Sequence, residues 1–83
     1  MRSHNRAFGK ALRKLRTATK TTQKELAIHS RLDRTYISLL ELGENSPTLD
    51  TLFALCSGLN ISLTELAAAI DAAIEAEVTT RKR

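Results

Sequence analysis

Apolar residues recur along most of the chain with the spacing of amphipathic helices. Phe8, Leu12 and Leu15 follow one another at intervals of four and three, with charged residues on the other faces. Such a stripe predicts a helix that buries one side. Similar stripes follow, and the last includes Leu63, Leu66 and Ile70. The predicted helices span residues 8–20, 22–31, 33–42, 48–59 and 62–78.

Capping residues stand at the predicted helix ends. Thr22 and Glu25 have the spacing of a capping box, in which the hydroxyl accepts from the Glu amide and the Glu side chain reaches back. The other predicted start and stop residues are Asp33, Thr48, the second box of Ser62 and Glu65, and the helix-ending Gly43. No strand is predicted, so we expect an all-α domain over residues 8–78. A mobile basic arm is expected over residues 1–7 and a mobile basic tail over residues 79–83.

Charge is distributed unevenly over the 83 residues, whose net charge is +4. Residues 1–20 carry seven bases and no acid, whereas residues 46–78 carry five acids and no base. This asymmetry favours one pole that faces a polyanion, although a solvated basic helix face explains it equally well. Among these bases, Lys10 and Lys14 are taken as candidate contacts to DNA phosphates.

Several function classes have no support in the sequence. Cys56 is the only cysteine and lies on an apolar stripe, while His4 and His29 have no neighbours at metal-ligand spacing. No catalytic grouping or phosphate loop is visible, so we expect no enzyme, cofactor or metal. No signal peptide or membrane span is visible either, and a cytoplasmic protein is expected.

Two short capped helices lie within about twenty residues, from Thr22 to Leu42, which is the length of a DNA-binding helix-turn-helix. The quoted motifs strengthen this interpretation: Gln23-Lys24-Glu25-Leu26-Ala27, Asp33-Arg34-Thr35-Tyr36-Ile37-Ser38, Glu41-x-Gly43 and Ser46-Pro47-Thr48-Leu49. Together they resemble the Cro/phage-repressor (XRE) family, and the second motif is similar to controller proteins of restriction–modification systems. The resemblance implies the five-helix lambda-repressor-like fold, a homodimer, and operator binding through the major groove of double-stranded DNA.

The resemblance also implies roles for matching residues. Gln23 would donate to a phosphate, and Arg34 and Thr35 would face bases, because arginine can bind guanine through two hydrogen bonds. Arg16 and Glu41 match a structural pair that joins the first and third helices. The remaining candidate DNA contacts are Tyr36, Ser38, Leu39 and Asn45.

Some assignments stay open. Tyr36 is either a core aromatic residue or a phosphate contact. Leu39 stands where a polar residue is common, and it either touches a thymine methyl or extends the core. Leu42 precedes Gly43 where the family commonly has Arg or Asn. Arg31 replaces the usual turn glycine, where a left-handed backbone would cost some strain.

The last helix has more apolar positions than a small core needs, which favours a two-fold dimer. The predicted interface consists of Leu55, Leu59, Ile70, Ile74 and Val78. The alternative function is a protein-interaction module, an adaptor or antitoxin component, with the same fold and weak DNA binding. A membrane-surface role is disfavoured because the polar side of this helix is acidic.

Overall fold

The chain forms five helices and no strand over the residues that the computed structural model describes, which are 2–81 for the backbone and 4–77 for the side chains. The helices are α1 (Arg2–Ala18), α2 (Gln23–Ser30), α3 (Arg34–Glu41), α4 (Leu49–Leu59) and α5 (Leu63–Arg81). The all-α prediction is therefore confirmed. The molecule measures 40 × 23 × 22 Å along its principal axes.

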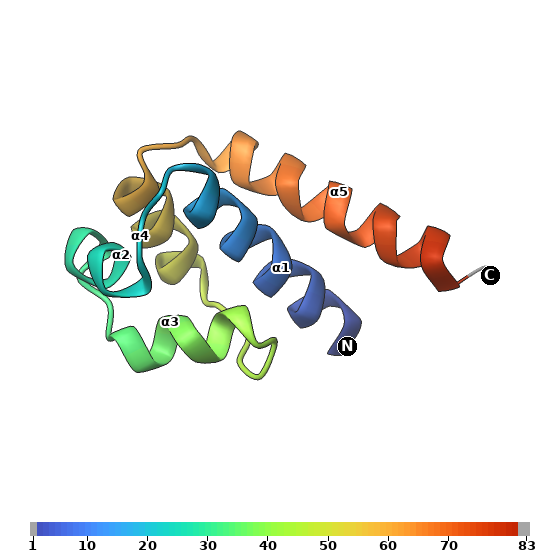
Figure 1. Cartoon of the computed structure of the whole chain (residues 1–83), viewed down its shortest axis with the longest axis horizontal. Coiled ribbons are helices and arrows are strands. Elements are labelled where there is room, and N and C mark those ends of the chain that lie inside the picture. The colour runs from blue at the N-terminus through green and yellow to red at the C-terminus, as the bar shows by residue number, and fades with distance from the viewer. Residues whose placement is uncertain (1, 82–83) are drawn as a thin grey trace.

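Helix α1 lies in the middle of the fold. Figure 1 shows α5 along one side of α1, and α3 along the other side. Helices α2 and α4 pack together at the end of the molecule where α1 finishes. The largest fully buried side chains come from all five helices and are Leu12, Leu26, Ile37, Leu40, Leu55 and Leu66. This core fixes α2 and α3 relative to α1.

The predicted caps begin the helices as expected. The Thr22 hydroxyl accepts from the Glu25 amide at 3.0 Å, and the Glu25 carboxylate accepts from the Thr22 amide at 2.9 Å. The second capping box, Ser62 with Glu65, makes the same two bonds at 3.0 and 2.8 Å. These side chains satisfy backbone donors that a helix start leaves unpaired.

Helix α3 ends through the glycine that the sequence indicated. Gly43 has φ +78°, and its amide donates to the Leu40 carbonyl at 3.1 Å. The Glu44 amide donates to the Leu39 carbonyl at 3.0 Å, which completes the usual pair of helix-ending bonds. A Cβ on Gly43 would lie 3.0 Å from the Cα of Arg6, so the glycine also permits close packing on α1.

The N-terminal segment differs from the expected mobile arm over residues 1–7. Helix α1 already begins at Arg2, and Ala7 has no exposed surface. The Ser46 hydroxyl donates to Asn5 Oδ1 at 2.9 Å, so the loop after α3 packs against these first turns. Over residues 2–7 the structure thus has helix where the sequence predicted an arm, and Met1 lies outside the described residues. At the other end, α5 continues to Arg81 through most of the expected tail over residues 79–83, and residues 82–83 lie outside the described residues.

Candidate nucleic-acid interface

The first turn of α3 exposes the residues that the sequence singled out. The Asp33 side chain accepts from the Thr35 amide at 3.1 Å and so caps the helix. Arg34 and Thr35 follow directly, and both side chains are exposed. The next turn presents Ser38, which is half-buried. The polar side chains at this end of α3 are therefore free of any role in the core.

A hollow of about 250 Å³ lies between the starts of α2 and α3. It is lined by Gln23, Arg34, Thr35 and Ser38. All four side chains carry hydrogen-bond donors, and the N-terminal ends of α2 and α3 lie beside the hollow, which favours an anion. The structure thus brings together four residues that are separated by up to fifteen positions in the sequence.

A buried ion pair holds α3 against α1. The guanidinium of Arg16 donates to the Glu41 carboxylate through Nε at 2.6 Å and through Nη2 at 3.0 Å. Its Nη1 donates to the Thr21 carbonyl at 2.8 Å. The two side chains are only 11% and 5% exposed. Hydrogen bonding to Glu41 raises the pKa of Arg16 above its already high value, so this guanidinium stays charged. The structural pair predicted from the resemblance is present.

Gln23 joins this network as well as the hollow. Its Nε2 donates to Oε1 of Glu41 at 3.0 Å. A side-chain amide nitrogen has two hydrogens, so one N–H remains for another acceptor. The carboxylate of Glu41 consequently fixes the direction of the Gln23 amide at the start of α2.

Tyr36 packs against the core and has a local partner. Its ring is half-buried beside the core cluster, and its hydroxyl shares a hydrogen bond with the Thr51 hydroxyl at 3.2 Å. Thr51, which is buried, also accepts from the Thr48 hydroxyl at 3.0 Å. Of the two interpretations left open, the geometry favours the core role.

The turn and the loop around α3 carry the departures from the family pattern. Arg31 has φ 60° and ψ 34°, the left-handed conformation that the sequence led us to expect there. Leu39 is half-buried, as is Asn45 in the following loop. Leu42 is 64% exposed and stands one residue before Gly43.

With this geometry established, a comparison with known families is decisive. Residues 12–66 match a family described as helix-turn-helix. The match covers well over half of the chain. The chain belongs to this helix-turn-helix family. It is a DNA-binding transcription regulator of the XRE type, as the resemblance implied, and this is a family of non-enzymatic proteins.

Relatives of this helix-turn-helix protein include restriction–modification controllers. It is 42% identical over 60 residues to the control protein C.MunI of Mycoplasma sp, covering 71% of this chain and 81% of that one. The crystal structure of C.AhdI from Aeromonas hydrophila is 39% identical, with TM-score 0.73, over 75% of this chain and 94% of that one. C.Esp1396I, solved as a tetramer with its natural 35 base-pair operator, is 30% identical, with TM-score 0.81, over 86% and 93%.

Two predicted phosphate contacts lie elsewhere in the helix-turn-helix protein. Lys10 and Lys14 line a groove between α1 and α5, and the Lys10 ammonium donates to Glu77 at 3.2 Å. Helix α1 meets α3 on its other side, where Gly9 faces the carbonyls of Leu40 and Glu41. The structure therefore does not bring these two lysines to the hollow. Sequence reasoning passed over Arg13, an exposed base four residues after Gly9 and so on the α3 side of the helix.

The predicted dimer interface also needs correction. Leu55 and Leu59 are 0% and 7% exposed, because this stripe of α4 faces the core of its own chain. Ile70 and Ile74 are half-buried on α5 and remain accessible, whereas the Val78 side chain lies outside the described residues. Among the described side chains of α4 and α5, the exposed large apolar residues are Leu49, Phe53 and Leu63.

Within the part of the chain that the structure describes, neither a metal centre nor a reactive thiol is indicated. Among the described residues, no group of three or more His, Cys, Asp or Glu side chains is placed to hold a metal ion. Cys56 is buried, and its burial, with a smaller effect of Glu65, raises the pKa of the thiol, which keeps it protonated. By length and composition, none of the described helices alone is sufficient to cross a membrane, and only the bent pair α4–α5 passes that test together.

Proposed function

We propose that this protein binds an operator in double-stranded DNA and contacts bases in the major groove through the first turn of α3. The observation that carries the proposal is the exposure of Arg34 and Thr35 on a helix whose other end is fixed by the buried pair of Arg16 and Glu41. A helix held in this way presents its first turn in one orientation, as sequence-specific contact requires.

Phosphate contacts would position this helix on the duplex. In the proposal, the free N–H of Gln23 and the amides at the start of α2 bind one phosphate. Arg13 supplies a positively charged side chain on the side of α1 that faces α3. Asn45 adds a neutral hydrogen-bond donor from the loop after α3. Base contacts fall to Arg34 and Thr35, with Ser38 and Leu39 facing the groove one turn later.

The proposed regulator is a homodimer built on the exposed apolar side chains of α4 and α5. Leu49 and Phe53 are one turn apart on α4 and are 64% and 52% exposed, and Leu63 at the start of α5 is 37% exposed. Ile70 and Ile74 extend this surface along α5. A two-fold axis here would suit a pseudo-palindromic operator, with recognition helices about 34–36 Å apart. The relative C.Esp1396I was solved as a tetramer in complex with its operator, which supports the assembly of more than one such dimer on DNA.

Selection of binding sequences from random DNA, at a stated salt concentration, tests this function. We expect a two-fold-symmetric site whose half-sites are one helical turn apart. Arg34→Ala should relax the preference at one base pair of each half-site, which corresponds to about 1–3 kcal/mol of discrimination. An unchanged preferred sequence would remove Arg34 from the base-contacting set, and a failure to select any sequence would overturn the proposed function. The proposal also places the protein in the cytoplasm, where it would meet its DNA.

Two adjacent basic residues of α1, Arg13 and Lys14, provide a matched pair of variants for testing the phosphate contact. Arg13→Ala should weaken binding to all sequences alike and reduce the slope of log K against log salt by about 0.9, the value for one phosphate contact. Lys14→Ala removes the same charge from the neighbouring position, which faces α5, and should leave that slope unchanged. Equal effects of the two variants would show that long-range charge, rather than a contact by Arg13, determines the salt dependence.

A further inference from the structure

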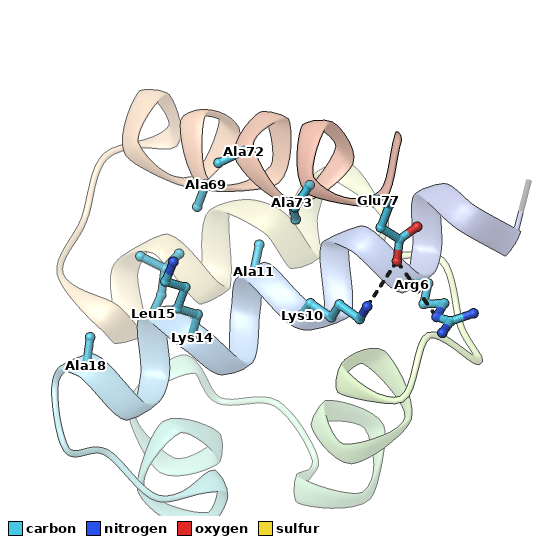
Figure 2. Close-up of a pocket in the computed structure, with 11 residues that line it drawn as sticks. Arg6, Lys10, Ala11, Lys14, Leu15, Ala18, Ala69, Ala72, Ala73 and Glu77 are labelled. Carbon is cyan, nitrogen blue, oxygen red and sulfur yellow. Dashed lines mark hydrogen bonds and ion pairs between the residues drawn. The ribbon is translucent and has the colours of Figure 1, made fainter. Parts of the chain in front are cut away.

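A groove runs between α1 and α5 on the described part of the molecule. It has a volume of about 570 Å³ and is lined mainly by small apolar side chains. Figure 2 shows Ala69, Ala72 and Ala73 of α5 above Ala11 and Leu15 of α1. Because the side chains are small, they leave open space between two helices that run side by side.

One wall of the groove is basic. Its basic residues lie on α1 at intervals of four, which places one positive charge on each helical turn: Arg6, Lys10 and Lys14. Near the N-terminal end of α1, Glu77 accepts from Lys10 at 3.2 Å and lies 3.8 Å from Arg6. Figure 2 shows these two ion pairs together at one end of the groove. Within residues 4–77, the Lys14 ammonium forms no ion pair or hydrogen bond, and it is the remaining cation on this wall.

The dimensions and the charges of the groove restrict what it can hold. A volume of about 570 Å³ lies within the usual range of about 300–1,000 Å³ for small-molecule sites, which are mostly apolar with a few polar groups. From Arg6 to Ala18 the groove follows twelve residues of helix, or roughly 18 Å at 1.5 Å per residue. A long apolar floor beside one unpaired cation matches a molecule with one extended chain and one negative head group.

We propose that this groove binds a single-chain anionic amphiphile, such as a long-chain carboxylate. The head group pairs with Lys14, and the chain lies along Ala11, Ala72 and Ala73. Glu77 closes the far end through its ion pairs with Arg6 and Lys10, and its single charge offsets one of these two cations. This site is separate from the hollow at the start of α3, so its occupancy can be measured without DNA.

Calorimetric titration of the full chain with a series from hexanoate to tetradecanoate, below their micelle concentrations, tests the proposal. Affinity should rise by up to about fourfold for each added CH₂, the gain expected from burying one methylene group. The rise should stop once the chain outgrows the groove. Dodecyltrimethylammonium, whose tail is one carbon longer and whose head is positive, should still bind at least tenfold more weakly than dodecanoate.

Three variants locate the ligand. Lys14→Glu should weaken dodecanoate binding at least tenfold, and Ala72→Leu should weaken it by filling the groove. Lys24→Glu makes the same charge change on α2, outside the groove, and should bind dodecanoate as the parent protein does. Circular dichroism checks that each variant is folded, and the DNA measurement above remains a separate readout.

Three results would overturn the proposal. Dodecanoate binding that is equal in the parent, Lys14→Glu and Ala72→Leu proteins would place the ligand elsewhere. Sedimentation in which the ligand-free protein forms an assembly that both groove variants dissociate would mean that a second copy fills the groove. Equal affinity for dodecanoate and dodecyltrimethylammonium would likewise show that Lys14 does not bind the head group.

Discussion

The two sides of α1 are built in different ways. Toward α3 the contact is close and polar: Gly9 lies against the carbonyls of Leu40 and Glu41, and Arg16 forms its buried pair with Glu41. Toward α5 the contact is made by alanines and leaves a groove. Ion pairs lie at one end of this groove, and in each pair the α1 side chain is more exposed than Glu77 of α5. The contact of α1 with α5 is the more extensive one, but the hydrogen bonds to Glu41 fix the orientation of α3 more narrowly.

This difference suits the two sides to different tasks. A recognition helix must be held in one orientation, since small displacements would move Arg34 away from a base edge. Helix α5 has no such requirement along its alanine face, and a loosely filled surface leaves space for another molecule. If the contrast holds, changes on the α3 side of α1 should destabilise the protein more than changes on the α5 side.

Breaking the buried ion pair should have the largest effect. Arg16→Met leaves the Glu41 carboxylate buried with Gln23 as its remaining side-chain partner, and we expect a loss of about 3–5 kcal/mol in the free energy of unfolding. Urea denaturation measures this loss. The double variant Arg16→Met with Glu41→Met should lose less, because no buried charge is left unpaired. A double variant less stable than Arg16→Met would mean that Glu41 stabilises the fold independently of Arg16, for example through Gln23.

Adding a single methyl group to the α3 side should come next. A Cβ on Gly9 would lie 2.5 Å from the carbonyl oxygens of both Leu40 and Glu41, so Gly9→Ala must displace α3. We expect a loss of about 1–3 kcal/mol by overpacking, despite the better helix propensity of alanine. Ala72→Leu adds more atoms on the α5 side and should change stability by less than about 0.5 kcal/mol. Similar losses in the two variants would contradict the contrast.

Removing the ion pairs between α1 and α5 should have a small effect. Lys10 and Arg6 are 56% and 67% exposed in their side chains, so water and salt screen their attraction to Glu77. Glu77→Gln should cost less than about 1 kcal/mol, and the difference from the parent should shrink at high salt. Thermal unfolding at two salt concentrations measures it. A loss as large as that of Arg16→Met would mean that α5 is fixed as firmly as α3.

The smallest effect should come from Cys56, which lies in the core shared by both sides. Its thiol has a pKa raised above the ordinary value of 9.0, mainly by burial. The folded state therefore keeps a proton that the unfolded state loses, and stability should fall as the pH rises above 9 toward the folded-state pKa. Denaturation at pH 8 and pH 10 should show a smaller fall for Cys56→Ala than for the parent. Equal falls would assign the pH dependence to other groups.

Features that depend on local chemistry could be predicted from the sequence. The capping boxes at Thr22 and Ser62 and the end of α3 at Gly43 depend on residues within one or two turns. The exposed position of Arg34 follows from its place beside the cap Asp33. The family motifs added the pairing of Arg16 with Glu41, which spans 25 residues and which no local pattern indicates.

Features that depend on how helices cross could not be predicted in the same way. An apolar stripe does not reveal whether it faces the protein's own core or a partner, and Leu55 and Leu59 face the core. Likewise, Lys10 and Arg13 are both charged positions of one helix, and only the placement of α3 and α5 separates them. The expected arm at the N-terminus was helical because the loop around Gly43 packs against it, which is a tertiary contact.

The carboxylate of Glu41 accepts hydrogen bonds from both α1 and α2, and this has an evolutionary consequence. A substitution at that position would leave Arg16 without its charge partner and release the amide of Gln23 in one step. Homologues should therefore either keep all three residues or exchange them as a set, whereas positions such as Ala72 should vary independently. The coupling would be visible as covariation among positions 16, 23 and 41 in any large collection of related chains.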